Sequence, residues 1–436
     1  MTISENFTKH YNQIKKGGIL VILKKLRSTI YLILQIPIYF ISIPTVIIVR
    51  IIRPWFLIRW KELTSSRIGH FSINTEIYCC ERDAGINFPS QRYVDLFYLK
   101  KNVCNNQLEK MWRRSLIILP NYLLFPLFKV NRFFNTFISG GNYHEIESSS
   151  TGGDRDVHNL FEKFQPHISF TQDEEVKGRK ILSKFGLPHD AKFVCLIVRD
   201  SAYLDRRKEI RIKDWNYHNY RDEDIDKYVL AAEELARRDY YIFRMGAKVL
   251  KPLKSSNPKV IDYANSGKRS DFMDIYLGAK CSFCISTSGA GFFAIPYIFR
   301  KPNAFTFVPI GYFFCNNSNH IMITKHHIHR KYKKRLTVSE IFSSNVALCF
   351  SSADFELNGI KLEDNSPKEI RDLAIEMDER LNGNWNETEE DILLQKKFWL
   401  IFKKNIKNLN LEKPLHGKIK SKFGAKFLRE NQNWIR

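Results

Sequence analysis

Short apolar runs and segments of helical periodicity alternate along most of the chain. The runs with strand character are FLIRWKEL (56–63), RYVDLFYL (92–99), SLIIL (115–119), KFVCLIV (192–198), YYIFRM (240–245), CSFCIS (281–286) and AFTFVP (304–309). Runs without a polar interruption are typical of strands buried on both faces. The segments QLEKMWRR (107–114) and DIDKYVLAAEELARR (224–238) instead place apolar residues on one helical face. This alternation predicts βαβ units and parallel sheets, an α/β fold.

Two capping boxes mark the starts of further helices. Thr171 and Glu174 stand three residues apart ahead of one helical segment, and Ser366 and Glu369 ahead of another, with Pro367 at its first position. A side-chain oxygen at the first residue and a carboxylate three residues later satisfy each other's free backbone N–H groups. We therefore expect a helix to begin at each of these places.

The most apolar segment lies near the N-terminus. From Ser28 to Val49 no charge interrupts roughly 22 residues, enough for a helix to match the hydrocarbon thickness of a bilayer. Both flanks are basic, so the distribution of positive charge gives no orientation. Pro37 and Pro44 fit a kinked helix lying in the cytoplasmic leaflet as well as a full span. The segment predicts membrane association, with spanning and monotopic arrangements both open.

The length of 436 residues predicts more than one domain. The stretch SGGNYHEIESSSTGGDRD (139–156) has the composition of a linker or surface loop. We expect a membrane-associated segment, a first Rossmann-like domain that includes the linker, a second Rossmann-like domain and C-terminal helices, with the boundaries 1–54, 55–185, 186–385 and 386–436.

The charge balance favours an anionic partner. Lysine and arginine outnumber the acids by 69 to 46, giving a net charge of +23 that is spread along the chain. Nucleic acid, anionic lipid and sugar diphosphates all fit this charge, but the chain carries no recognisable nucleic-acid-binding module. The eight cysteines have no regular spacing, which indicates reduced core residues. Cys281 and Cys284 form a CxxC without a second pair, so we expect no zinc site there.

The sequence STSGAG (286–291) follows one predicted strand and precedes a predicted helix. In that geometry, free backbone N–H groups and the positive end of a helix dipole point at one place, where they would stabilise a bound anion. The hydroxyls of Ser286, Thr287 and Ser288 add donors, and Gly289 allows close approach. We interpret the loop as the diphosphate site of a nucleotide-sugar donor. A plain strand-to-helix turn is the alternative.

Two other predicted strands are followed by residues that could bind a ligand. Arg199 and Asp200 follow one strand, with Tyr203 close behind, while Arg244 and Gly246 follow the next. Ligands of open α/β sheets bind at the carboxyl ends of strands. We expect both arginines and Gly246 at the diphosphate, and Asp200 and Tyr203 at the nucleotide or sugar. Either arginine could instead hold a structural carboxylate.

Three polar residues, Ser270, Asp271 and Asp274, begin the helix before the strand that leads to the glycine loop. Ser270 and Asp271 are candidates for nucleotide or sugar binding, and N-capping alone would also explain all three. We expect a loop through Arg67, Gly69 and His70 after the first predicted strand, and His70, in RIGHF, is the candidate catalytic base. An inverting sugar transferase needs a group that takes the proton of the acceptor hydroxyl, and histidine is suited to this near neutral pH.

Metal-binding patterns were weighed and are not favoured. Asp154 and Asp156 form a DxD, and RDEDID (221–226) places acids in the first turn of a helix, where they complement its dipole. A solvated, basic loop accounts for four histidines better than a metal site does. These histidines are His320, His326, His327 and His329. We expect no metal and no cofactor other than the nucleotide sugar as co-substrate.

The order of several motifs resembles a family of bacterial glycosyltransferases from surface-polysaccharide gene clusters. The motifs are RIGHF (67–71), CNNQLEKMWRR (104–114), FVCLIVRDSAYL (193–204), RMGAK (244–248), RSDFMDIYLGAKC (269–281) and DNSPKEI (364–370). The resemblance implies a GT-B-type fold with two facing Rossmann-like domains and no obligatory metal. It places the acceptor in the domain 55–185 and the donor in the domain 186–385. One departure is GAGFFAIPYIFRKP (289–302), which lacks the acid that often binds the ribose, so we assign Asp262 to that role.

The resulting prediction is a glycosyltransferase that moves a sugar from a nucleotide-diphosphate donor to a lipid-linked or growing surface glycan, such as lipopolysaccharide O-antigen or capsule. We expect it at the bacterial inner membrane, with catalytic domains in the cytoplasm and an anionic membrane surface as partner. Two alternatives are a sugar-nucleotide epimerase of the same architecture and a membrane-associated nucleic-acid-binding protein. We expect no nucleic-acid partner.

Overall fold

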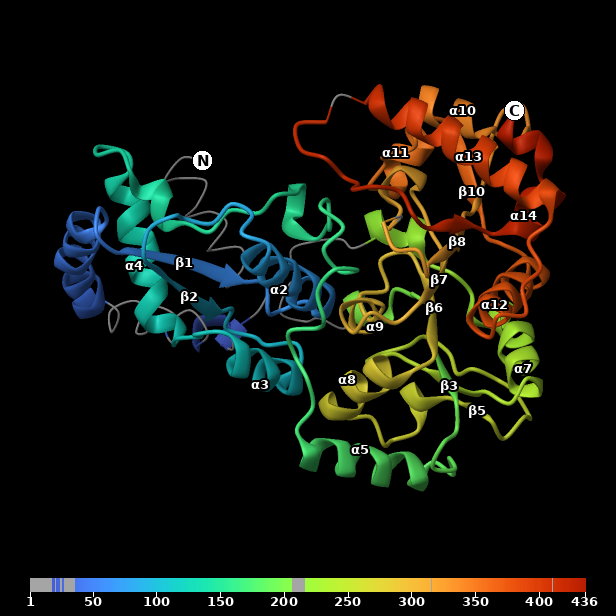
Figure 1. Cartoon of the computed structure of the whole chain (residues 1–436), viewed down its shortest axis with the longest axis horizontal. Helices are drawn as coiled ribbons and strands as arrows, with labels where there is room; N and C mark the ends of the chain where they lie inside the picture. Colours follow the sequence, from blue (N-terminus) through green and yellow to red (C-terminus); the bar gives the residue numbers. More distant parts are fainter. Residues whose placement is uncertain are drawn as a thin grey trace. The chain divides into compact units, whose positions relative to one another are not determined.

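The chain forms two compact units (Figure 1). The structure, a computed structural model, describes residues 36–205, 216–314, 316–409 and 411–436, together with residues 18, 19, 21–23 and 26. Unit 1 comprises Met1–Leu63, Pro89–Asn102 and Leu116–Glu147, and unit 2 comprises Thr64–Phe88, Val103–Ser115 and Ser148–Arg436. The division differs from the expected boundaries because the chain passes repeatedly from one unit to the other. Two early segments that we expected in the first domain therefore belong to unit 2.

Unit 1 is built on a small parallel sheet. Strands β1 (Leu57–Leu63) and β2 (Tyr93–Leu99) pair in parallel, as the apolar runs predicted. A buried ion pair, Arg59 to Asp95 at 2.7 Å, joins the two strands. The predicted strand SLIIL contributes only an isolated bridge at Ile118. Among the described residues this unit thus has two strands, which is less than the Rossmann-like sheet that we expected.

Helices accompany this sheet, two of them in the stretches 36–63 and 116–147 that the structure describes. One covers residues 36–52, and the other is α4 (Asn121–Phe134), which is followed by the short 3-10 helix η1 (Gly141–His144). Residues 28–35 of the predicted membrane segment lie outside the described residues. Within the described part of the chain, every helix falls short of the length or hydropathy required to cross a bilayer.

Unit 2 contains a seven-stranded, all-parallel sheet of order β11-β8-β7-β6-β3-β4-β5. The strands are β3 (Phe193–Ile197), β4 (Tyr241–Arg244), β5 (Val260–Ile261), β6 (Phe283–Thr287), β7 (Asn303–Thr306), β8 (Ile321–Ile323) and β11 (Lys422–Phe423). Strands β3 to β5 run outward in one direction, and β6 then returns to the other side of β3. The strand order therefore reverses between β3 and β6, the place where ligands of such sheets bind.

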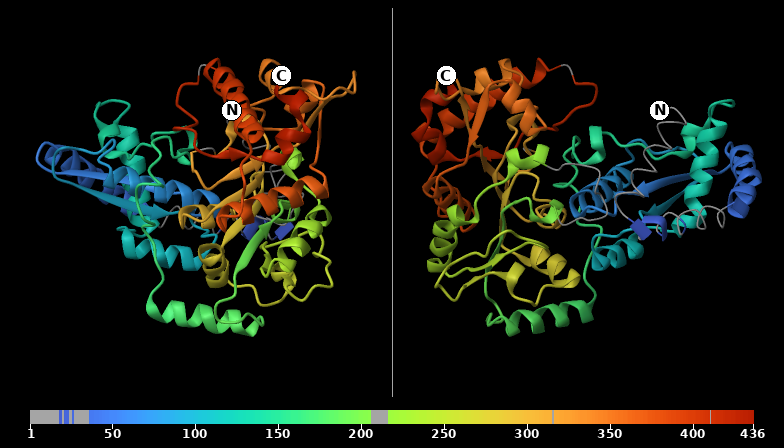
Figure 2. Two further views of the ribbon diagram at one scale, coloured as in Figure 1. Left: turned by 45° about the vertical axis from the view of Figure 1, so that its right-hand side comes forward. Right: turned by 180° about the vertical axis from the view of Figure 1, so that it is seen from behind.

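Helices cover both faces of this sheet (Figures 1 and 2). Helices α7 (Val229–Arg237) and α12 (Pro367–Leu381) pack together on one face, and α8 (Asp271–Lys280) and α9 (Ala294–Ile298) on the other. Outside α9 and α8 lie α2 (Ile68–Asp83) and α3 (Asn106–Ser115). The other helices are α5 (Gln172–Lys184), α6 (Ala202–Asp205), α10 (Val338–Ser343), α11 (Ser352–Leu357), α13 (Glu389–Lys407) and α14 (Ala425–Glu430). Both predicted capping boxes are present, at the starts of α5 and α12.

The histidine-rich segment differs from the expected solvated loop. Strand β9 (His326–His329) pairs antiparallel with β10 (Ile360–Glu363). Because side chains alternate along a strand, His327 points inward and is fully buried, and His320 is buried as well. Burial lowers the pKa of each of these two histidines to about 3, so both are neutral residues of the core.

A buried ion network ties α2 to the rest of unit 2. Glu76 is fully buried and accepts hydrogen bonds from Arg300 (2.5 Å) and His167 (3.1 Å). Glu76, Cys80 and His167 lie close enough together to hold a metal. However, the Arg300 guanidinium already occupies this place, and burial raises the pKa of the Cys80 thiol, which keeps it protonated. The network is therefore better explained as a structural ion pair than as a metal site.

This network predicts how stability depends on pH. Burial alone would lower the pKa of His167, but hydrogen bonds and charge from Glu76 and Asp83 raise it above its usual value. A group whose pKa is raised in the folded state stabilises the fold fully at pH values below its unfolded pKa, which is about 6.5 for histidine. This stabilisation is lost as the pH rises through the folded-state pKa. We expect the melting temperature to fall over this range.

Calorimetric melting of the wild type and of His167→Gln across this pH range measures the effect. The variant is expected to show a flatter dependence, because it cannot gain the charge. His189→Gln is the matched control, since His189 is exposed and pairs only with its neighbour Asp190. Parallel pH profiles for the wild type and His167→Gln would contradict the assignment.

Candidate functional site

A cavity of about 670 Å³ opens where the strand order of unit 2 reverses. It is lined by residues that directly follow four neighbouring strands: Val198 to Asp200 after β3, Gly246 to Val249 after β4, Ser288 to Phe293 after β6, and Phe307 to Pro309 after β7. All of its lining residues belong to unit 2. Its volume lies within the range of about 300–1,000 Å³ that small-molecule ligands occupy.

The beginning of α2 forms one wall of this cavity. Arg67, Gly69 and His70 all line it, although we expected a loop here rather than the first turn of a helix. No side chain caps the helix and its first turn carries no acid, so the positive end of the dipole is not offset within α2. A Cβ on Gly69 would lie 3.4 Å from the Cα of Gly291, so glycine here allows a close approach of helix and loop.

The glycine loop lines the cavity with Ser288 and Gly289, and Gly289 has a left-handed φ of +69°. The expected helix does not follow at once, because α9 begins only at Ala294 and is five residues long. The hydroxyls that we expected on a phosphate have partners within the fold. Ser286 and Ser288 donate to the carbonyls of Thr287 and Val308, and Thr287 accepts from the N–H of Arg199.

These hydrogen bonds favour the alternative considered for the loop, a plain strand-to-helix turn. Ser286, Thr287 and Ser288 are buried and their hydroxyls bond within the fold, although Ser288 also lines the cavity. The reason is that a loop between buried parallel strands must satisfy its own polar groups. The backbone at Gly289 and the start of α2 remain the parts of this wall that suit an anion.

Arg221 lies against the glycine loop. A Cβ on Gly289 would come within 2.7 Å of its Nη1 atom. Arg221 sits at the end of the 3-10 helix η4 (Asn216–Arg221), where it donates to the Tyr220 hydroxyl (2.7 Å) and contacts His218 Nδ1 (3.0 Å). Among the residues that the structure describes, no carboxylate pairs with this guanidinium. A cation without a carboxylate partner beside a glycine loop is suited to bind an anionic ligand.

The electrostatic potential around His218 is strongly positive. Burial lowers its pKa to about 3, and the charges of Arg221, Arg199 and Arg67 contribute to the same shift. Overall, six basic and three acidic side chains line the cavity. The basic ones are Arg67, Arg155, Arg199, Arg221, Lys248 and Arg269, and the acidic ones are Asp154, Asp200 and Asp274. Such a cavity favours an anion of more than one charge.

A buried network holds this basic wall in place. Glu223 is fully buried, accepts hydrogen bonds from Tyr228 and from Thr306 (3.0 Å), and donates through its backbone N–H to the carbonyl of Arg199 (3.0 Å). Lys325, also buried, donates to the carbonyl of Asp222 (2.7 Å). Residues 222 and 223, which directly follow Arg221, are thereby anchored to the end of β7.

The structure brings together several of the predicted site residues. Arg199, Asp200, Tyr203 and Gly246 all line the cavity. The Arg199 guanidinium also pairs with Asp222, which was the structural alternative considered from the sequence. Its positive charge is therefore partly offset, whereas that of Arg221 is not.

Other predicted residues have structural partners and lie outside the cavity lining. Arg244 is fully buried and pairs with Asp262 (3.2 Å), so neither side chain faces the proposed diphosphate or ribose. Ser270 caps α8 through the N–H of Met273, and Asp271 accepts from the N–H of Asn106 (2.8 Å). For these two residues N-capping and packing, the alternative explanation, is what the contacts support.

His70 and Asp274 are two of the cavity-lining groups that could move a proton. His70 is half-buried in the first turn of α2, with Nδ1 3.3 Å from the amide oxygen of Asn74. Burial raises the pKa of Asp274 to about 6. However, its carboxylate already accepts from Arg269 (2.5 Å) and from Tyr263 (3.2 Å). His70 therefore remains the better candidate base.

The far part of the cavity is aromatic. The rings of Tyr312 and Phe350 lie 4.2 Å apart, and Arg155 donates to the carbonyl of Tyr312 (2.6 Å) while its guanidinium stacks on Phe314. Tyr217 lines the cavity beside His218. Aromatic faces next to cations suit a nucleobase or a sugar ring linked to phosphate.

The acidic pairs considered as metal ligands are not arranged together. Asp154 lines the cavity, but the Asp156 carboxylate accepts from the N–H groups of Leu160 and Phe161. Asp224 caps a short helix and pairs with Lys251. Cys281 and Cys284 are buried in the core around β6.

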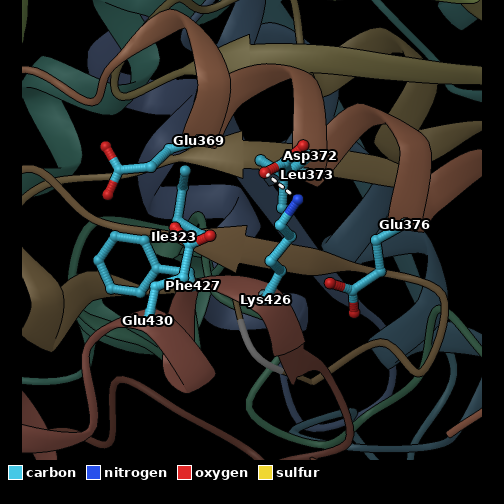
Figure 3. A pocket seen from close by; sticks show the side chains of 9 residues that line it. Ile323, Glu369, Asp372, Leu373, Glu376, Lys426, Phe427 and Glu430 are labelled. Atoms are coloured by element: carbon cyan, nitrogen blue, oxygen red, sulfur yellow. Dashed lines mark ion pairs between the residues drawn. The ribbon is translucent and has the colours of Figure 1, made fainter.

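A much smaller hollow of about 10 Å³ lies between α12 and α14 (Figure 3). Glu369, Asp372 and Glu376 from α12 face Lys426 and Glu430 from α14, and Lys426 pairs with Asp372 at 2.8 Å. A space of this size holds about one water molecule. The larger cavity is therefore the candidate active site.

Several cavity residues were not identified from the sequence as site residues: Arg67, Arg155, Tyr217, His218, Arg221, Lys248, Tyr312 and Phe350. Only one local signal was available for Arg221, the density of polar and aromatic residues in NYHNYRDED (216–224) between two apolar segments. Its approach to Gly289 depends on how η4 packs, which no local pattern encodes.

Comparisons with known proteins add two structural likenesses. No protein-family model and no curated protein matches the chain. A glycosyl transferase family 9 protein from Veillonella parvula DSM 2008 aligns at 11% identity and a TM-score of 0.38, over 62% of this chain and 86% of that one. The ADP-heptose LPS heptosyltransferase II of E. coli aligns at 10% identity and a TM-score of 0.33, over 57% and 84%. These TM-scores lie below the level at which two chains share a fold, so the interpretation of the cavity rests on its own residues.

Proposed function

We propose that the protein is a glycosyltransferase that takes a sugar from a nucleoside-diphosphate donor bound in the cavity of unit 2. The observation that carries this proposal is Arg221, a cation without a carboxylate partner among the described residues, held against Gly289 where the strand order reverses. The start of α2 and the other basic side chains add positive potential at the same place. A diphosphate with an attached nucleoside matches this charge and the aromatic surface beside it.

The chemistry follows from these positions. As the bond from the sugar to the diphosphate breaks, negative charge grows on the leaving oxygen, and Arg221 with the backbone at Gly289 stabilises it. The acceptor hydroxyl attacks the anomeric carbon and loses its proton to His70, which lines the same cavity. Because guanidinium groups and helix amides supply the positive charge, we propose a metal-independent reaction of the GT-B type.

The acceptor and the location complete the proposal. We propose a lipid-linked or growing surface glycan as acceptor, at the bacterial inner membrane with the cavity in the cytoplasm. The basic, apolar N-terminal region supports a position at the membrane, where a lipid-linked acceptor resides. The nature of the sugar and of the nucleobase is left to experiment.

A direct test is calorimetric titration of the full chain with ADP, GDP, UDP and CDP in EDTA. We expect at least one nucleoside diphosphate to bind, with an affinity that weakens as salt rises because the contacts are charged. Mixing the corresponding activated sugars with the chain and a lipid extract should then release the nucleotide. If none of the four diphosphates binds, the proposed function is wrong. If one binds but no sugar is transferred or hydrolysed, a binding role replaces the enzymatic one.

A further inference from the structure

The helix at residues 36–52 has an inverted polarity. Every exposed residue of its first sixteen positions is apolar: Ile36, Pro37, Phe40, Ile41, Ile43, Pro44, Ile47, Ile48 and Ile51. Its buried positions include Ser42, and the exposed positions recur every three or four residues, so they form one continuous face. A helix on the surface of a soluble protein shows the opposite pattern, with polar residues outward.

A second apolar segment lies at the end of α4 in the same unit. Phe133, Phe137 and Ile138 are exposed, and Phe137 is the most exposed of them at 74%. The predicted membrane segment did not include these residues, since they come about ninety positions later in the chain.

Specific contacts join the two segments. Arg50, near the end of the 36–52 helix, donates to the Asn131 side chain (3.0 Å) and to the carbonyl of Ile138 (3.0 Å). Arg53 lies 4.2 Å from the ring centre of Tyr143. The 36–52 helix and α4 lie side by side in both figures (Figures 1 and 2).

The charge of both segments is of one sign. Residues 36–61 and 115–144 contain no aspartate or glutamate, and their basic residues are Arg50, Arg53, Arg59, Lys61, Lys129 and Arg132. Two of these pair with acids outside the ranges, Arg59 with Asp95 and Arg132 with Glu145. Lys129 and Arg132 are exposed. An apolar surface bordered mostly by cations is complementary to a bilayer, which presents apolar chains beneath anionic headgroups.

We propose that unit 1 docks on an anionic lipid bilayer through a lipid-facing surface made of the 36–52 helix and residues 133–143. The 36–52 helix keeps Ser42, Val46 and Val49 buried in the protein and inserts only its opposite face among the lipids. Arg50, Arg53 and Lys129 contact the headgroups. This inference rests on the proposed function in one respect only, because that function gives the protein a reason to be at a membrane. Its test requires no enzymatic activity.

The test is co-sedimentation of the full chain with vesicles of phosphatidylcholine, with and without phosphatidylglycerol. Phe133→Glu/Phe137→Glu changes the second segment, and Ile43→Glu/Ile47→Glu the first. Each double variant should lower partition into anionic vesicles at least about tenfold, because it removes apolar contact and adds charge of the wrong sign. The matched control is Leu393→Glu/Leu400→Glu on α13, where both leucines are equally exposed; it should bind as the wild type does.

A second measurement tests whether the segment around residue 137 contacts the lipid directly, whereas α13 does not. A fluorophore on Phe137→Cys should be quenched by nitroxide-labelled lipid, and one on Leu400→Cys should not, after subtraction of label on the wild type. Unquenched label at position 137, or full binding by the Phe133→Glu/Phe137→Glu variant, overturns the proposal. So does a wild-type dimer in ultracentrifugation that both double variants abolish, since a second copy would then cover this surface. Nucleoside diphosphate titration of the same samples reports on the proposed function separately.

Discussion

His70→Gln is expected to lower kcat for sugar transfer about 100-fold or more, the usual effect of removing a general base. Glutamine keeps a polar group of similar reach in the first turn of α2 but cannot accept a proton. The affinity for nucleoside diphosphate should stay within about twofold, because the histidine acts on the acceptor hydroxyl and not on the leaving group. Single-turnover transfer and calorimetric titration of the same preparation measure the two quantities.

The control for this change is His189→Gln, since His189 is an exposed residue paired with Asp190 and should leave kcat unchanged. Asp274→Asn tests a second proton-bearing group of the cavity. An unchanged kcat in His70→Gln together with a large loss in Asp274→Asn would assign the base to Asp274. The raised pKa of that carboxyl would then be a catalytic property and not only a result of burial.

Arg221→Ala should lower kcat/KM about 100-fold, as removal of one donor to a developing anion does in other enzymes. Part of the loss should appear as weaker diphosphate binding, about tenfold, because a charge-assisted hydrogen bond is lost. Arg221→Lys should recover part of the activity, since lysine keeps the charge without the two-pronged geometry.

A second readout shows whether Arg221 acts through charge. The charge of Arg221 helps to lower the pKa of His218, so its removal should move that pKa up toward the ordinary value. Titration of the His218 ring by NMR measures this shift. Arg237→Ala is the matched control, because Arg237 is an exposed arginine on α7 whose partner is Glu234. Normal transfer by Arg221→Ala would remove the main support for the proposed function.

Much of unit 2 could be predicted from local patterns. The buried strands β3, β4, β6 and β7 are apolar runs between helical segments, and the capping boxes of α5 and α12 fix the starts of those helices. Strands β8 and β11 were missed, because they are three and two residues long and their pairing joins segments that are far apart in the sequence. Short strands of this kind have no periodicity to detect.

The sequence predicted which strand ends line the candidate site, but not which side chains point into it. Arg199, Asp200 and Gly289 follow strands and line the cavity as expected. Arg244 is instead the last residue of β4, in register with Leu196 and not with Arg199, and it is fully buried and paired with Asp262. Gly69 was expected in a loop but lies in the first turn of α2, and its close approach to Gly291 shows what the missing side chain allows.

The passage of the chain between the two units has a practical meaning for protein engineering. The helix that bears His70 is encoded before residue 89, whereas the strands that surround it in the cavity are encoded after residue 148. A chimaera that joins the first half of this gene to the second half of a related one would therefore pair a foreign cavity with the native α2. We expect a chimaera to take on the donor preference of a related protein only when residues 64–88 and 103–115 are exchanged together with the C-terminal half.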